Sequence, residues 1–290
     1  MRSRRDLLAL AGSAALVLAC NRPKRGGRSD RAGGAEPQER SLAFGGKTRT
    51  FFVQPAGGAA PTVMAIHGHK SGPEVMFRTH DWAKTAAAQG WTGIYPSTGE
   101  GESTDPEGGD HAFLTQLFQQ AADQGQADPS RCWAVGFSGG AYKAYQLASQ
   151  ASRTVAGIVA CSGKMGDLDT GYDGYDPRVT RASPVSILHV HGGQDTTVPL
   201  AGGTYGEGAK KRTALGVQQG LDLWIAHLGM KPTDGPPLPG VPARCRVNQW
   251  VADGGHRIAL IVDPDLGHTY PEPWLNETAV AFFQSIPPRR

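Results

Sequence analysis

The chain has 290 residues, and the first forty differ in composition from the rest. Residues 1–40 carry nine basic and four acidic side chains, whereas the remaining 250 carry 20 basic and 22 acidic ones, a net charge of −2. A near-neutral domain behind a basic leader gives no reason to expect a nucleic-acid partner. We therefore expect an export signal over residues 1–20, a flexible tether over 21–40 and a single folded domain over 41–290.

The leader resembles a twin-arginine export signal, because the pair Arg4-Arg5 precedes leucines. Its apolar run, residues 7–19, is too short to remain as a membrane-spanning helix. The end of the run, Val17-Leu18-Ala19-Cys20, resembles a bacterial lipobox, in which the cysteine is lipidated. The alternative is a secretory signal cleaved nearby, with an incidental cysteine. We expect a lipoprotein anchored through Cys20, or otherwise a periplasmic or extracellular protein.

Short apolar runs alternate with helical patterns along the domain. Strands are predicted over residues 47–54, 62–67, 91–95, 133–135, 155–160, 185–190, 246–251 and 257–262. Helices are predicted over residues 73–89, 111–124 (with Asp110 as N-cap), from 141 onward, and over 209–228 and 273–286. This alternation implies βαβ crossovers, so we expect an α/β fold with a mostly parallel sheet and helices on both faces.

One stretch is central to this arrangement. The predicted strand 133–135 leads into Gly136-Phe137-Ser138-Gly139-Gly140, and a helical segment follows from Ala141. The pattern indicates a strand, a sharp turn and a helix, with the Ser138 hydroxyl exposed at the turn where a base can reach it. A Gly-x-Ser-x-Gly pattern also arises by chance in a chain with 40 glycines, and the alternative is an ordinary turn serine.

Two further polar residues follow predicted strands. Asp195 comes shortly after strand 185–190, and His268 follows strand 257–262. Because the carboxyl ends of parallel strands meet at one edge of a sheet, we expect Ser138, Asp195 and His268 to lie together. Their order along the chain is that of the α/β-hydrolases, with a nucleophile, an acid and a base.

Other residues compete for these roles. The alternative acids are Asp167, Asp263 and Asp265, and the alternative bases are His227, on a predicted helix, and His256, in a predicted hairpin loop. For His189, within a strand, and His191, just after it, we expect packed or hydrogen-bonded roles.

Three cysteines remain in the domain, Cys132, Cys161 and Cys245. In an oxidising compartment an odd number leaves at least one thiol unpaired. Cys132 begins one predicted strand and Cys161 ends the next, so these two would lie at opposite ends of the sheet, too far apart for a disulfide. None has metal-ligand spacing, and we expect each to be structural.

Four motifs together carry a resemblance to a known family: His-Gly at 67–68, Gly-x-Ser-x-Gly at 136–140, His-Gly-x-x-Asp-x-x-Val-Pro at 191–199 and Gly-His-x-x-Pro at 267–271. With them, residues 45–285 resemble the poly(3-hydroxybutyrate) depolymerase and feruloyl esterase group of α/β-hydrolases. Dienelactone hydrolases and prolyl oligopeptidases share much of the pattern. This chain departs from the group at Gly139, where alanine is frequent, and at Cys245, which lacks a paired cysteine.

The resemblance implies an oxyanion hole made by the backbone N–H groups of Gly139 and His69, and no cofactor. The loop 163–182 carries Tyr172 and Tyr175 among several acids. Its spacing departs from that of a calcium-binding loop. We therefore expect no metal site and a solvated loop that faces the substrate, with the two tyrosines as candidate substrate-binding residues.

The sequence thus predicts a serine carboxylesterase that acts on small soluble esters: aromatic or acetyl esters of sugars, or hydroxyalkanoate oligomers. We expect no nucleic-acid partner, and contact with a membrane only through the lipid anchor. A serine peptidase of the prolyl-oligopeptidase type is one alternative, although the chain has no room for the gating domain of such enzymes. A non-catalytic binding module on a hydrolase fold is the other alternative.

Overall fold

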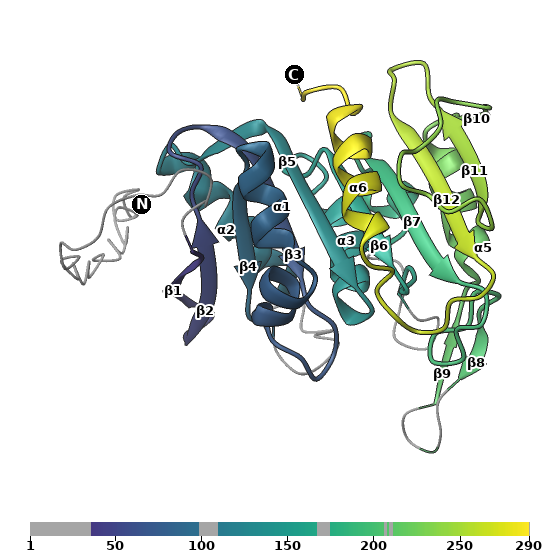
Figure 1. The fold of residues 1–290 in the computed structure, drawn as a ribbon, viewed down its shortest axis with the longest axis horizontal. Coiled ribbons are helices and arrows are strands. Elements are labelled where there is room, and N and C mark those ends of the chain that lie inside the picture. Colours follow the sequence, from purple (N-terminus) through teal and green to yellow (C-terminus); the bar gives the residue numbers. More distant parts are fainter. Residues whose placement is uncertain (1–35, 99–109, 167–174, 206–207, 209–210, 290) are drawn as a thin grey trace, which may run out of the picture. The chain divides into compact units, whose positions relative to one another are not determined.

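The computed structural model describes residues 36–98, 110–166, 175–205, 208 and 211–289. The chain divides into two units, Met1–Ala32 and Gly33–Arg290, and the described residues belong to the second. A ten-stranded sheet runs through this unit in the order β1-β2-β4-β3-β5-β6-β7-β12-β11-β10 (Figure 1). The strands are β1 Gln38–Phe44, β2 Lys47–Gln54, β3 Ala60–Ile66, β4 Thr92–Pro96, β5 Ala127–Phe137, β6 Gly157–Cys161, β7 Ser186–Gly192, β10 Lys231–Pro232, β11 Arg246–Val251 and β12 Arg257–Asp263.

The middle of the sheet is parallel and its two edges are antiparallel. Strands β4, β3, β5, β6, β7 and β12 pair in parallel, whereas β1 and β2 at one edge and β11 and β10 at the other pair antiparallel. The strands β4, β6 and β7 are buried at every residue, as is typical of parallel strands covered on both faces. The predicted α/β-hydrolase arrangement is confirmed.

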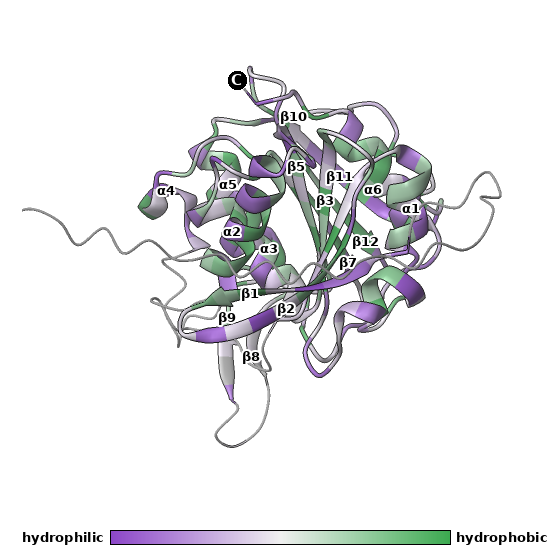
Figure 2. Cartoon of the chain, turned by 90° about the vertical axis from the view of Figure 1, so that its left-hand side faces the viewer, coloured by the Kyte–Doolittle hydropathy of each residue, from purple (hydrophilic) through white to green (hydrophobic). Residues whose placement is uncertain are grey.

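Helices cover both faces of this sheet. They are α1 Trp82–Gln89, α2 Asp110–Asp123, α3 Gly139–Gln150, α4 Pro177–Thr180, α5 Val217–His227 and α6 Trp274–Gln284. Figure 2 shows α2, α3 and α5 on one side of the strands and α1 and α6 on the other, and each group packs on its own hydrophobic core. None of the described helices is long and apolar enough to cross a membrane.

The predicted helix over residues 73–89 is interrupted. A single π-helical turn, Val75–Thr79, is followed by Asp81 in the left-handed region at φ 53°, and α1 begins only at Trp82. Tertiary packing explains the break, because the Trp82 side chain is fully buried and its Nε1–H donates to the Tyr270 hydroxyl at 2.7 Å.

The first part of the predicted helix 209–228 is also wrong. Strand β8, Gly203–Tyr205, pairs antiparallel with β9, Arg212–Ala214, and α5 begins at Val217. A close approach of two backbones fixes this hairpin: a Cβ atom at Gly202, which has φ 72°, would lie 2.3 Å from the nitrogen of Gly216. Local composition does not reveal such long-range contacts.

Asp110 lies within α2 and is not its N-cap. Its carboxylate is buried and forms ion pairs with Arg49 and, at 3.5 Å, with Lys143. These contacts tie β2 to α2 and α3, so a residue predicted to act on its own helix instead joins three elements.

The sheet begins earlier in the chain than predicted. Its first strand, β1, starts at Gln38, within the segment 21–40 predicted as a flexible tether.

The three described cysteines are all free thiols. Cys161 ends β6 opposite Phe137, whereas Cys132 lies five residues earlier on β5, so the two are separated along the strands as expected. Burial raises the pKa of each of these thiols to about 12, which keeps them protonated and unreactive. Cys245 is half-buried.

We predict that Gly140→Ala destabilises the protein by about 3 kcal/mol or more, because overpacking against a rigid backbone has few routes of relief. A Cβ atom at Gly140 would lie 2.1 Å from the carbonyl oxygen of Ile66. Urea unfolding measures the effect. Gly58→Ala is the matched control, since a Cβ atom there meets nothing within 4 Å. Equal stability of the two variants would contradict the prediction.

Candidate active site

Ser138 lies at a strained turn between β5 and α3. Its backbone has φ 52° and ψ −117°, a conformation that residues other than glycine rarely adopt. The Ser138 N–H donates to the carbonyl of Cys161 at 2.9 Å, which ties the turn to β6. Gly136 and Gly140 allow the helix to pack against the strand, because a Cβ atom at Gly136 would lie 2.1 Å from the Gly140 carbonyl oxygen. This is the strand, sharp turn and helix that the sequence indicates.

The three residues predicted as nucleophile, acid and base are in contact. His268, in the loop after β12, has its Nε2 atom 2.9 Å from the Ser138 Oγ atom. Its Nδ1 atom is 2.8 Å from Oδ2 of Asp195, in the loop after β7. With Nδ1–H donating to the carboxylate, Nε2 is free to accept the hydroxyl proton of Ser138.

Backbone N–H groups hold Asp195 in this position. Its Oδ1 atom accepts from the N–H groups of Thr197, at 2.9 Å, and Val198, at 2.8 Å, while Oδ2 faces His268. Burial raises the pKa of the Asp195 carboxyl, but the hydrogen bonds from His268 and Val198 outweigh it and the net direction is downward. Asp195 is therefore ionised at neutral pH.

The loops that carry Asp195 and His268 are joined by backbone contacts. Gly193 N–H donates to the Asp263 carbonyl at 2.8 Å, and Gln194 N–H donates to the Leu266 carbonyl at 3.0 Å. A Cβ atom at Gly192 would lie 2.2 Å from the Leu266 oxygen. The first glycine after His191 thus permits the approach that brings acid and base together.

The two backbone groups predicted for the oxyanion hole are neighbours. A Cβ atom at Gly139 would lie 3.3 Å from the nitrogen of His69. Within the described ranges, neither the Gly139 nor the His69 N–H donates a hydrogen bond to the protein, so both are available to an oxygen atom beside Ser138.

His67 holds the loop that carries His69. Its Nδ1–H donates to the Gly68 carbonyl at 2.8 Å, and its Nε2 accepts from the Thr98 N–H at 3.1 Å. Burial lowers the pKa of His67, so the ring is neutral, as these two bonds require. The His67-Gly68 pair is evident in the sequence but this role is not, and the repeat of the His-Gly pair at 191–192 is the signal that could have indicated it.

The competing acids and bases have other contacts. Asp263 is bound by Arg244, whose Nε and Nη2 atoms lie 2.9 and 2.7 Å from its oxygens. Asp265 lies in the turn that follows, and Asp167 lies outside the described residues. His227 on α5 donates to the Ala182 carbonyl at 2.8 Å, and His256 lies in the hairpin turn between β11 and β12.

Some predicted site residues are not tested by this geometry. Tyr172 and Cys20 lie outside the described residues, and half-buried Tyr175 packs against the core on the α3 side of the sheet. Among the described residues, no group of three or more His, Cys, Asp or Glu side chains could hold a metal ion.

One aromatic ring lies beside the base, and two further rings pack against it, none of which the sequence pattern had indicated as part of the site. The Phe137 ring lies 5.3 Å from the His268 ring, and His80 stacks on Tyr270 at 4.1 Å between ring centres. His80 also contacts the Phe137 ring edge-on at 6.0 Å. Because His80 comes from the segment before α1, no local pattern around His268 could have indicated it.

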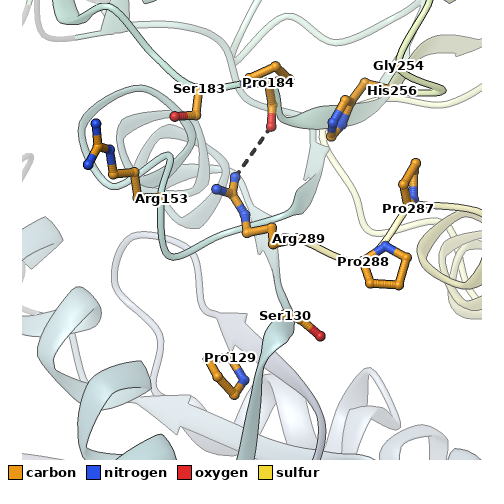
Figure 3. Close-up of a pocket in the computed structure, with 10 residues that line it drawn as sticks. All are labelled: Pro129, Ser130, Arg153, Ser183, Pro184, Gly254, His256, Pro287, Pro288 and Arg289. Carbon is orange, nitrogen blue, oxygen red and sulfur yellow. Dashed lines mark hydrogen bonds between the residues drawn. The ribbon is translucent and has the colours of Figure 1, made fainter.

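A separate cavity of about 900 Å³ lies at the other end of the strands, away from the candidate site. It is lined by Pro129, Ser130, Arg153, Ser183, Pro184, Gly254, His256, Pro287, Pro288 and Arg289 (Figure 3). Of these, residues 129–130, 183–184 and 254–256 lie near the starts of β5, β7 and β12, whereas Ser138, Asp195 and His268 follow the ends of strands. The cavity is therefore not part of the candidate site.

The contact between Arg244 and Asp263 predicts a pH-dependent contribution to stability. Hydrogen bonds from Arg244 hold the pKa of Asp263 below its ordinary value. A lowered pKa gives stability that is present above the unfolded-state pKa of about 4 and is lost as the pH falls through the folded-state value. Arg244→Gln should therefore be less stable than wild type at neutral pH, with a difference that shrinks on acidification.

Urea unfolding between about pH 7 and pH 2.5 measures this difference. Arg246→Gln is the control, since Arg246 is exposed and forms no ion pair with the described residues. A difference between wild type and Arg244→Gln that stays constant over this range would contradict the prediction.

Known proteins that are similar to this chain include esterases. Residues 97–214 match the model of a family described as phospholipase/carboxylesterase. A curated relative, the bifunctional acetylxylan esterase/xylanase XynS20E of Neocallimastix patriciarum, is 30% identical over 142 residues, which cover 47% of this chain and 19% of the relative. The chain thus spans about a fifth of the length of that relative.

Solved structures show the same fold at low sequence identity. The acetyl xylan esterase from Aspergillus awamori superposes with a TM-score of 0.64 at 15% identity, covering 86% of this chain and 99% of that one. A mutant of the feruloyl esterase module from Clostridium thermocellum, complexed with sinapinate, has a TM-score of 0.55 at 9% identity and covers 87% of both chains. The chain therefore has the α/β-hydrolase fold and is similar to esterases with that fold.

Proposed function

We propose that this protein is a serine carboxylesterase in which Ser138 is the nucleophile, His268 the general base and Asp195 the residue that orients it. The observation that carries the proposal is the continuous hydrogen-bonded contact from Ser138 Oγ to His268 Nε2, at 2.9 Å, and from His268 Nδ1 to Asp195 Oδ2, at 2.8 Å. The similarity to esterases supports the same reaction class.

In the acylation step, His268 Nε2 takes the hydroxyl proton as Ser138 Oγ forms a bond to the ester carbonyl carbon. The carbonyl oxygen becomes an oxyanion, which the N–H groups of Gly139 and His69 stabilise. The imidazolium then gives its proton to the leaving alkoxide as the ester bond breaks. Asp195 stays ionised and stabilises the imidazolium throughout.

In the deacylation step a water molecule replaces the alcohol. His268 Nε2 takes one of its protons, the oxygen attacks the acyl carbon, and a second oxyanion forms in the same place. When this intermediate collapses, the proton on His268 returns to Ser138 Oγ and the free acid leaves. Every proton in the cycle moves through His268, so the reaction needs no cofactor.

For the substrate we propose small soluble esters, including acetylated or feruloylated sugars. The Phe137 ring lies beside the base and can contribute apolar and stacking contacts, and the rings of His80 and Tyr270 pack against Phe137. The names of similar proteins, an acetyl xylan esterase and a feruloyl esterase module, fit the same class. Hydroxyalkanoate oligomers are a further candidate of similar size.

We predict that the protein hydrolyses short-chain p-nitrophenyl esters and that Ser138→Ala lowers kcat/KM on the order of 10³-fold or more. Asp195→Asn should cost about 10⁴-fold in kcat, because an amide selects the wrong tautomer of the base. Asp263→Asn is the matched control and should keep near-wild-type kcat. Undiminished hydrolysis by Ser138→Ala, or faster cleavage of peptides than of esters, would overturn the proposal.

A fluorophosphonate probe should label the wild type at Ser138, and a folded protein without labelling would indicate a binding module.

The substrate class is tested by comparing methyl ferulate, acetylated xylose, short acyl esters and a polyhydroxybutyrate film. We expect turnover of the soluble esters and little clearing of the film, because a solid polyester requires an adsorbing surface. Clearing of the film at rates that match the soluble esters would contradict this expectation.

We further propose export through the twin-arginine route and anchoring through a lipid on Cys20, supported by the Arg4-Arg5 pair and the junction Ala19-Cys20. The prediction is that Cys20→Ala moves the protein from the membrane fraction to the soluble fraction. Fractionation of cells that express each form measures this change. Continued membrane association of the variant would contradict the anchor.

A further inference from the structure

Two buried histidines take no part in the proposed reaction. His189 and His191 lie on β7, in the middle of the sheet, and both side chains are fully buried. Their rings stack at 5.3 Å with an angle of 10° between their planes. Because a buried polar group is costly unless it is hydrogen-bonded, the partners of these rings indicate what they do.

The carbonyl of Val198 fixes the state of the first ring. It lies 2.8 Å from Nε2 of His191, and a carbonyl can only accept, so Nε2 carries the hydrogen. Burial lowers the pKa of His191, which keeps the ring neutral and leaves Nδ1 as an acceptor. The Nε2–H of His189, 3.0 Å away, donates to that atom.

The same reasoning extends to the next residue. Burial also lowers the pKa of His189 well below its ordinary value, so its Nδ1 atom is an acceptor. The hydroxyl of Tyr145 on α3 donates to it at 2.7 Å. A one-way series of hydrogen bonds therefore runs from Tyr145 through His189 and His191 to Val198.

The series ends at the residue that holds the acid. The N–H of Val198 donates to Oδ1 of Asp195 at 2.8 Å, while its carbonyl accepts from His191. The Nε2 atom of His191 also lies 3.5 Å from Oδ2 of Asp195, the oxygen that accepts from His268. His191 thus contacts Asp195 from behind, both through Val198 and directly.

We propose that His191 is a positioning residue for Asp195, and that His189 and Tyr145 hold His191 in the one tautomer that can do this. The inference rests on the proposed function of Asp195. His191 touches neither the substrate nor Ser138. Its N–H fixes the peptide of Val198 and faces the carboxylate, so that Asp195 keeps the orientation in which Oδ2 meets His268.

The test compares two substitutions of His191. His191→Phe keeps a ring but removes the donor, and a misplacement of the acid should lower kcat about 10- to 100-fold with little change in KM. His191→Gln restores an amide donor and an acceptor, and should recover most of the lost kcat. Ser186→Ala is the control, because Ser186 is a buried residue of the same strand that accepts from Arg257 N–H at 3.1 Å, at the opposite end from Asp195. It should keep the wild-type kcat.

A second measurement needs no substrate. The low-field proton resonance of the hydrogen bond between His268 Nδ1 and Asp195 should be lost or shifted in His191→Phe, and retained in His191→Gln and Ser186→Ala. Unchanged kcat and resonance in His191→Phe would overturn the inference, as would an equal kcat loss in Ser186→Ala. A wild type that hydrolyses no ester would contradict the proposed function, and the resonance would still decide this inference.

If His191→Phe does not fold, Tyr145→Phe and His191→Gln decide. Tyr145→Phe leaves Nδ1 of His189 without its donor and should shift the resonance and lower kcat less than 10-fold. Folded Tyr145→Phe with wild-type kcat and resonance would overturn the role of the series. A folded His191→Gln with kcat lowered more than 100-fold would overturn the role assigned to the donor of His191.

Discussion

The candidate site depends on backbone segments that approach one another more closely than any side chain would permit. Gly140 brings α3 against the end of β3, and Gly192 brings the loop after β7 against the loop after β12. Without the first approach, the strained turn that exposes Ser138 could not form, and without the second the acid would lie away from the base. Glycine at such positions costs conformational entropy in folding, and the packing of the helices on both faces of the sheet offsets that cost.

Two His-Gly pairs, one before Ser138 in the sequence at 67–68 and one after it at 191–192, use the imidazole in the same way. His67 follows β3 and joins the Gly68 carbonyl to the Thr98 N–H, which holds the loop of the oxyanion donors. His191 near the end of β7 joins His189 to the Val198 carbonyl, which holds the loop of the acid. Burial keeps both rings neutral, so each presents one donor and one acceptor. A neutral imidazole can connect a carbonyl to a donor group, and an apolar residue of the same size cannot.

The sequence was sufficient to predict the fold and the three contacting residues because both depend on patterns along the chain. Apolar runs gave the parallel strands, and the order of Ser138, Asp195 and His268 followed from residues placed directly after those strands. What it could not predict depends on contacts between distant segments. The break before Trp82 is set by packing on Tyr270, and the ion pairs of Asp110 come from two other elements. The direction of the hydrogen bonds through His189 and His191 can be assigned only from the position of the Val198 carbonyl, which no local sequence pattern predicts.

The side chain of the base is partly exposed to solvent, whereas the side chains of the acid and of His191 behind it are not. The His268 side chain is 19% exposed, as a group that must reach a substrate has to be, whereas the side chains of Asp195 and His191 are 0% exposed. Because the His268 ring is on a loop and partly exposed, its surroundings alone do not fix its orientation, and the hydrogen bond to Asp195 must do so. Asp195 in turn is fixed by Val198 and His191, in surroundings where a low dielectric strengthens each hydrogen bond. The buried side chains in the centre of the sheet thus fix the orientation of His268, the one group that has to remain accessible. This explains why polar residues occupy β7, a strand that packing alone would fill with apolar residues.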